Sequence, residues 1–355
     1  MPLQPDILIN PLGKTLKHPL VRDLAWLMAA PDLVQTRWPG RPDLATLGFE
    51  SSGALETFLQ QLDSHPQPLE DWLGNNSSRR LGPYHEHLWQ FLLHTSPNTE
   101  LLAHNIPVRV ERRTLGELDL IYRAHDSDLR HLEVAVKFYL GIPQGPQQPD
   151  SAARWIGPGG LDSLALKVSH LSRHQLPLMF SPAARLALTE RFTELGIQQP
   201  PQPPQPQLAM PGVLFRPWHA PSLPLPAITA PGALQGLWCH WRDWSKLCSE
   251  HPTLQFGSCL TRPHWLAPPR PDHWQSQRTL SRTLAAHFAT WATPVQLMLC
   301  RDPLEFAASP LPHPANDNAP PEQVGRRIFV VSDDWPRQIP LPPATSCDPG
   351  HQLTL

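Results

Sequence analysis

The stretch GELDLIYRAHDSDLRHLEVAVK (residues 116–137) decides the fold expected for this chain. Its first part, ELDLIY (117–122), alternates as a β-strand does, and the apolar segment HLEVAVKFYL (131–140) is typical of a strand at the centre of a sheet. A short polar turn separates the two segments, so we expect them to be antiparallel neighbours. Because side chains alternate between the two faces of a strand, Asp119 and Glu133 can point to the same face.

The segments on either side of this hairpin predict an α/β core. PYHEHLWQFLLH (83–94) has apolar residues at helical spacing, and residues 101–112 alternate as a strand. After the hairpin, a helix is expected from about residue 161, another over 182–195, and a further strand over 212–216. We therefore expect a mixed sheet flanked by helices.

Further elements are expected on both sides of this core. Toward the N-terminus, the spacing of apolar residues predicts helices over 19–30 and 52–62. Toward the C-terminus, the patterns predict helices near 232–248 and 275–291 and strands near 254–260, 295–300 and 326–332. This C-terminal part is rich in Trp, and the helical spacing of Trp238, Trp241 and Trp244 favours packing in a core or an interface over stacking on nucleic-acid bases.

The distribution of proline suggests how the chain is divided. The sequence contains 46 Pro, many of them in discrete runs that we interpret as linkers and tails. We predict a helical N-terminal region (1–77), a core (78–222) with a Pro/Gln-rich insertion (196–207), a Trp-rich α/β C-terminal region (223–335) and a disordered tail (336–355).

Composition limits the classes of function. The formal net charge is −2 with a pI of about 6.8, and residues 101–180 carry nine Lys and Arg against eight Asp and Glu. Proteins that grip a duplex through many phosphates are usually basic or carry a basic stripe. Three explanations stay open for a nucleic-acid-binding function: a groove that is basic only locally, a modest affinity, or a different partner.

The location and redox setting follow from other absences in the sequence. The five Cys form no C-x-x-C pair, which disfavours a disulfide framework and a structural zinc site. The N-terminal residues lack the pattern of a secretory signal, and no run of 18 apolar residues could span a membrane. We expect a cytoplasmic protein without a membrane association.

The carboxylate pair requires compensation. An unpaired charge buried on an apolar strand costs several kcal/mol, and two nearby carboxylates raise each other's pKa. A bound Mg²⁺ or Mn²⁺ would relieve both problems, because hard oxygen ligands suit these ions, and such an ion can promote attack on a phosphate. The alternative is that Asp119 and Glu133 simply meet Arg or Lys partners at a sheet surface.

The order of these elements and motifs resembles the PD-(D/E)XK nuclease superfamily, and more closely a bacterial family of unknown function assigned to it. The resemblance rests on LGPYHEHLW (81–89), GELDL (116–120), EVAVKFYLG (133–141) and LKVSHLSRHQLPL (166–178). It implies a restriction-endonuclease-like fold in which Asp119 and Glu133 are metal ligands. It also implies that Glu86 and Gln175 match residues that some members bring to the active site.

The lysine of the motif departs from the family pattern. The usual acid-x-Lys spacing would place a lysine at position 135, where this chain has Ala135. Lys137 could reach back along the strand over about 6.6 Å, a β-bulge could restore the geometry, or Lys167 on the following helix could supply the charge. If none of these holds, the fold is present without the activity.

The leading hypothesis is a Mg²⁺-dependent (or Mn²⁺-dependent) nuclease that hydrolyses phosphodiester bonds in DNA or RNA. In this hypothesis Asp119 and Glu133 hold the ion, Lys137 or Lys167 orients the water, and Glu86 and Gln175 assist. The alternative is a catalytically inactive nuclease-like fold that binds nucleic acid or protein. The expected partner is therefore nucleic acid, and the sequence identifies no protein partner.

Overall fold

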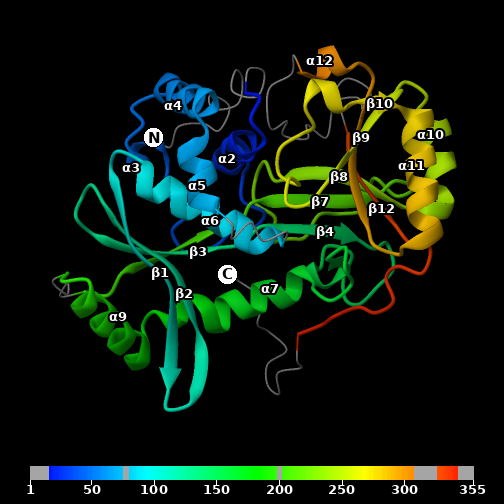
Figure 1. Ribbon diagram of the computed structural model, residues 1–355. Helices are drawn as coiled ribbons and strands as arrows, with labels where there is room; N and C mark the ends of the chain where they lie inside the picture. Colours follow the sequence, from blue (N-terminus) through cyan, green and yellow to red (C-terminus); the bar gives the residue numbers. More distant parts are fainter. Residues whose placement is uncertain (1–15, 75–79, 198–201, 308–325, 343–355) are drawn as a thin grey trace.

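The computed structural model describes residues 16–74, 80–197, 202–307 and 326–342. The chain folds as a mixed α/β protein with two mixed β-sheets flanked by helices (Figure 1), which confirms the predicted fold class. Among the described residues, no helix has the length and apolar character needed to cross a bilayer.

The first sheet contains the predicted hairpin. It has the order β1-β2-β3-β6, with strands Thr99–Val110, Arg113–Ala124, Leu129–Val134 and Gln205–Ala209. β1, β2 and β3 are antiparallel neighbours, as predicted for β2 and β3, and β6 runs parallel to β3. The register pairs Leu120 with Leu132, so the next pair outward places Asp119 opposite Glu133.

The second sheet continues toward the C-terminus in the order β10-β9-β11-β12-β8-β7-β4-β5. In chain order its strands are β4 (Lys137–Gly141), β5 (Trp155–Ile156), β7 (Gly212–Pro217), β8 (Leu234–His240), β9 (Phe256–Leu260), β10 (Gln275–Ser276), β11 (Val295–Cys300) and β12 (Arg326–Val331). The pairing of β7 with β8 crosses the position at which the sequence suggested a boundary between the core and the C-terminal region.

The two sheets meet where the predicted strand over 131–140 is interrupted. β3 ends at Val134 and β4 begins at Lys137. Backbone hydrogen bonds to the adjacent segment of the same chain, residues 209–211, continue through this gap. The amide of Ala135 donates to Ala209 O (2.9 Å), and the amide of Lys137 donates to Pro211 O (3.2 Å). The single strand that the sequence predicts is therefore two strands, one in each sheet, because Pro211 in the neighbouring segment has no N–H to continue a regular ladder.

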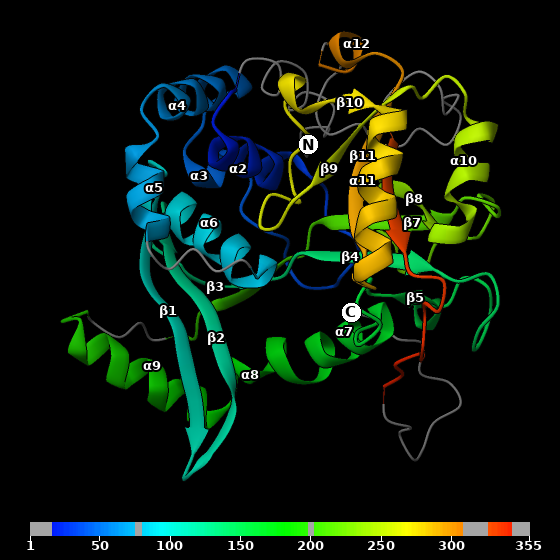
Figure 2. The same cartoon turned by 45° about the vertical axis from the view of Figure 1, so that its right-hand side comes forward.

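Helices cover the two faces of the sheets (Figures 1 and 2). One face carries α2 (Pro19–Ala29), α3 (Leu44–Leu47), α4 (Ser52–Ser64), α5 (Gln67–Leu73) and α6 (Leu81–Thr95). Leu132, Phe138 and Leu140 point into this helical layer and share one buried cluster with it. On alternate positions, Ala135 and Tyr139 point to the opposite face and pack against α7 (Leu164–His170).

The segment after α7 shapes the site described below. A π-helical turn (Leu171–Gln175) follows α7 directly, then come the short α8 (Leu176–Leu178) and α9 (Pro182–Glu194). α9 packs on the outer part of the β1–β2 hairpin through a separate buried cluster. In the C-terminal part, α10 (Trp244–Glu250) and α11 (Gln277–Thr290) lie beside the second sheet, and α12 is Pro303–Ala307.

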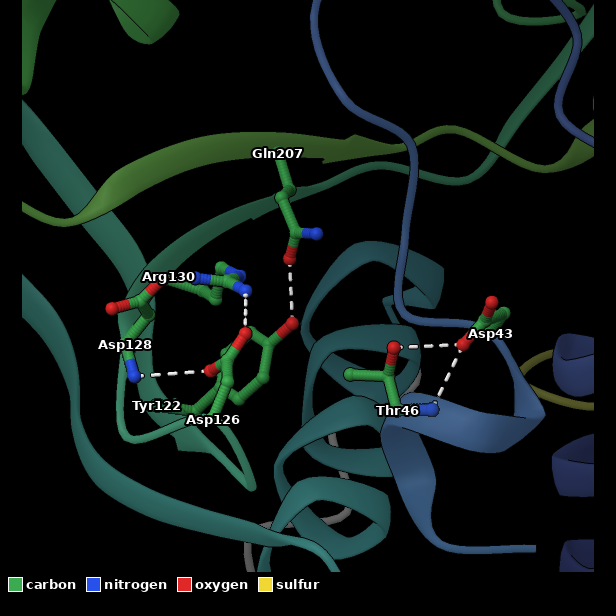
Figure 3. Close-up of polar contacts among 7 residues, drawn as sticks. All are labelled: Asp43, Thr46, Tyr122, Asp126, Asp128, Arg130 and Gln207. Carbon is green, nitrogen blue, oxygen red and sulfur yellow. Dashed lines mark hydrogen bonds and ion pairs between the residues drawn. The ribbon is translucent and has the colours of Figure 1, made fainter. Parts of the chain in front are cut away.

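Two sequence predictions are wrong. Residues 232–248 do not form one helix, because Leu234–His240 is the buried strand β8 and only Trp244–Glu250 is α-helical. The Pro/Gln-rich insertion over 196–207 ends earlier than predicted, because residues 205–207 belong to β6. Parallel pairing with β3 satisfies their backbone, and the hydroxyl of Tyr122 donates to Gln207 Oε1 at 2.6 Å (Figure 3).

The predicted disordered tail falls largely outside the described residues, which end at residue 342. Within the described part of it, the hydroxyl of Ser163 donates to Pro340 O at 2.7 Å. This contact joins the tail to the residue that caps α7, since Ser163 Oγ also accepts the amide of Leu166.

Candidate functional site

The structure brings Asp119 and Glu133 together on the face that α7 covers. Glu133 is fully buried, whereas Asp119 is partly exposed. Asp119 Oδ2 accepts the amide of Val134 at 3.0 Å, which holds its carboxyl group against the backbone beside Glu133. The predicted pair therefore exists as a buried acid and a solvent-reachable acid on adjacent antiparallel strands.

Burial raises the pKa of both carboxyl groups. Burial raises the pKa of Asp119 from 3.8 to about 6, and the charge of Glu86 adds to the rise. Burial, together with the charge of Asp119, raises the pKa of Glu133 well above its ordinary value. Both carboxyl groups therefore hold a proton more tightly than an isolated, exposed acid would.

Gln175 connects Glu133 to the cations of the covering helix. Its side-chain nitrogen donates to Glu133 Oε1. Its oxygen accepts Lys167 Nζ at 2.8 Å and lies 2.8 Å from His170 Nδ1. The amide therefore presents its donor to the carboxyl group and its acceptor to the lysine, as the donor and acceptor chemistry of both neighbours requires.

The π-helical turn explains why Lys167 and Gln175 meet. In a continuous α-helix, residues eight apart point about 80° away from each other. The wider turn over Leu171–Gln175 takes up this excess, so both side chains reach the same side of the segment. Burial lowers the pKa of Lys167, while the negative charge of Glu133 acts in the opposite direction.

Lys137 lies on the same face of the sheet but has a different partner. Its Nζ is 2.7 Å from Asp162 Oδ2, and the hydroxyl of Tyr139 donates to the same oxygen at 3.2 Å. Lys137 is still close enough to Lys167 for its charge to lower the pKa of Lys167. Lys137 and Lys167 were the two candidates to replace the motif lysine that is absent at position 135. Lys167 is the one linked to the carboxylate pair, through Gln175.

Glu86 approaches the site from α6. Its Oε1 accepts Gln90 Nε2 at 3.0 Å, and its negative charge helps to raise the pKa of Asp119. Glu86 is therefore an electrostatic neighbour of Asp119.

The residues present fit a divalent cation with oxygen ligands. Glu133 Oε2 is buried, and no hydrogen bond reaches it from the described residues. A buried carboxyl oxygen without a partner is costly, and a hard cation shared with Asp119 would compensate it. Among the described residues, no group of three or more His, Cys, Asp or Glu is arranged to hold a metal. The protein ligands would therefore be these two acids, as is common for Mg²⁺, which keeps several of its waters.

Two partners in this network were not singled out from the sequence. Asp162 precedes the cap of α7, and His170 ends that helix. Asp162 is far in sequence from Lys137, so no local pattern indicated their pairing. His170 is five residues before Gln175, and only knowledge of the π-helical turn would have indicated that contact.

The fold and the site together define an α/β protein in which a mixed sheet holds two carboxyl groups, one of them fully buried, beside a lysine on a helix. The chain belongs to the family described as Domain of unknown function (DUF1853), whose family model matches residues 22–331. Comparison with curated proteins and with solved structures gave no match.

Proposed function

We propose that this protein is a Mg²⁺- or Mn²⁺-dependent phosphodiesterase that acts on nucleic acid. The observation that carries the proposal is the pair Asp119 and Glu133, in which the buried Glu133 Oε2 lacks any partner among the described residues. A helix (α6), the antiparallel strands β1, β2 and β3, a later helix (α7) and β6 parallel to β3 support the resemblance to PD-(D/E)XK nucleases on which the choice of substrate rests, although β4 and β5 precede α7 and α8 and α9 precede β6.

Asp119 and Glu133 would hold the cation, which when bound supplies Lewis-acid chemistry at a phosphodiester. Lys167 Nζ places a positive charge beside the pair, where negative charge develops on the phosphate during attack. Gln175 fixes the separation of Lys167 and Glu133 by bonding to both. Glu86 adds negative charge near Asp119, which strengthens the attraction for a cation.

Incubation of the purified protein with labelled single-stranded and double-stranded DNA and RNA tests the proposal. We expect cleavage that requires Mg²⁺ or Mn²⁺, is lost with EDTA, and is abolished by Asp119→Ala and by Glu133→Ala. Glu117→Gln is a matched control, because Glu117 is an exposed acid on the same strand. Absence of cleavage by the wild type, or equal cleavage by Asp119→Ala, would rule out the proposal.

A second candidate is a nuclease-like module that binds without catalysis. It is favoured by the ion pair between Lys137 and Asp162. The family motif would place a lysine at position 135, and the lysine at position 137 is already paired. In such a module a proton held by the pair Glu133 and Asp119 would replace the cation. Calorimetric titration with Mn²⁺ separates the two candidates, because the enzyme should bind Mn²⁺ at neutral pH and the module should not.

A further inference from the structure

The β1–β2 hairpin extends well beyond its neighbour β3 in the sheet that holds the carboxylate pair (Figures 1 and 2). The part of it next to the tip is braced, because Ile106, Val108 and Leu118 are buried in one cluster with residues of α9. Its tip is different, because every residue from 109 to 115 is exposed. The hairpin is thus a supported two-stranded ribbon with a free end.

The tip carries a local excess of positive charge. Arg109, Arg112 and Arg113 lie within five positions, against the single acid Glu111. In the described part of the chain, no hydrogen bond or ion pair engages these three guanidinium groups. Three exposed arginines with no internal role, on a protein whose net charge is −2, point to an external anion.

Resting on the proposed function, we propose that this hairpin tip binds the phosphates of a nucleic-acid duplex whose scissile bond lies at the carboxylate pair. The tip, residues 109–115, contains no aromatic side chain, whereas proteins that hold single strands use aromatic rings as stacking platforms. A two-stranded β-ribbon has the width that the major groove of a duplex admits.

The spacing along β2 sets the scale of the contact. Arg113 and Asp119 are six residues apart on one strand, which corresponds to about 20 Å. On a duplex this distance spans about six base pairs along the axis. A rigid duplex that extends at least this far from the cut site can therefore touch both the tip and the carboxylate pair.

The test compares two variants that each remove two exposed positive charges. Arg112→Ala/Arg113→Ala alters the tip, and Arg278→Ala/Arg282→Ala alters α11, which lies beside the other sheet. Binding of the full chain to a labelled 24-base-pair duplex and to one of its single strands is measured by fluorescence anisotropy in EDTA, so that cleavage does not interfere. The measurement is repeated over a range of salt concentrations.

We expect the tip variant to lower the slope of log affinity against log salt by about 1.8 for the duplex, since each phosphate contact contributes about 0.9. Between 50 and 200 mM salt, wild-type affinity should then fall about 12-fold more than that of the tip variant. The α11 variant and the single strand should show no such difference. Equal duplex binding by the wild type and the tip variant overturns the inference and favours a protein contact through the exposed Val110 and Leu115.

Cleavage assays separate this inference from the proposed function. If the wild type binds the duplex through the tip but cleaves nothing, the proposed nuclease activity is refuted and duplex binding by the tip stands. A wild type that cleaves, with a tip variant of unchanged affinity and salt slope, refutes the tip alone. With both correct, the tip variant should retain wild-type cleavage of a duplex shorter than about six base pairs on either side of the cut.

Discussion

Replacing Asp119 with Asn should make the metal-free protein more stable at neutral pH, although it removes a residue of the proposed site. Asn keeps the oxygen that accepts the amide of Val134 and carries no charge. The substitution therefore removes a repelled, desolvated charge while retaining that hydrogen bond. A charged residue of a functional site commonly lowers the stability of the free protein, because its charge is compensated only when the ligand is bound.

The magnitude follows from the pKa of Asp119, which burial raises from 3.8 to about 6. A carboxyl group with a raised pKa binds its proton more tightly in the folded protein, so its contribution to stability is present below about pH 3.8 and is lost as the pH rises through about 6. The loss grows from less than about 1 kcal/mol at pH 4 to about 3 kcal/mol at pH 7. For a chain of 355 residues, the last value corresponds to a rise in Tm of about 4 °C in Asp119→Asn.

The assay is thermal and urea unfolding of wild type and Asp119→Asn in EDTA, at several pH values between 4 and 8. The difference between the two proteins should grow with pH and level off above about pH 6. Glu117→Gln removes an exposed acid from the same strand and should show no such pH-dependent gain. A destabilised Asp119→Asn, or a difference that does not change with pH, would show that the carboxyl group is not under the electrostatic strain described here.

Three further predictions concern the same region. Lys167→Ala should lower the rate of metal-dependent cleavage at least 100-fold and Lys137→Ala less than 10-fold, because Lys167 is linked to Glu133 through Gln175. Kinetic assays that rank the two variants in the opposite order would contradict this assignment. Gln175→Leu should lower the free energy of unfolding by about 1–3 kcal/mol, because it leaves Glu133 Oε1 and Lys167 Nζ unpaired; urea titration measures this loss, and a neutral result would mean that water replaces the amide. Gly212→Ala should prevent soluble expression or remove cooperative unfolding, because an added Cβ would lie 1.8 Å from Lys137 O in the neighbouring strand; a normally folded Gly212→Ala, judged by circular dichroism and thermal melting, would show that β4 and β7 can separate without loss of the fold.

Local patterns were sufficient for most elements of the core. α6, β1, β2, α9 and β7 lie where alternation or helical spacing placed them, within a few residues at their ends. The prediction over 232–248 failed because Trp238, Trp241 and Trp244 have helical spacing by coincidence, while the residues before Trp241 pair between β7 and β12. Strand pairing with distant segments overrode a local signal there.

The sequence by itself predicted that Asp119 and Glu133 can point to the same face of the sheet, because a short turn makes their strands antiparallel neighbours and side chains alternate along each strand. The register that places them opposite each other comes from the structure. The sequence did not determine which lysine accompanies them. The break between β3 and β4 and the pairing of Lys137 with Asp162 depend on contacts between residues distant in sequence. The π-helical turn that aligns Lys167 with Gln175 depends on helix geometry that no spacing encodes. Only the tertiary structure settles such contacts, because each side chain takes the partner that packing brings within reach.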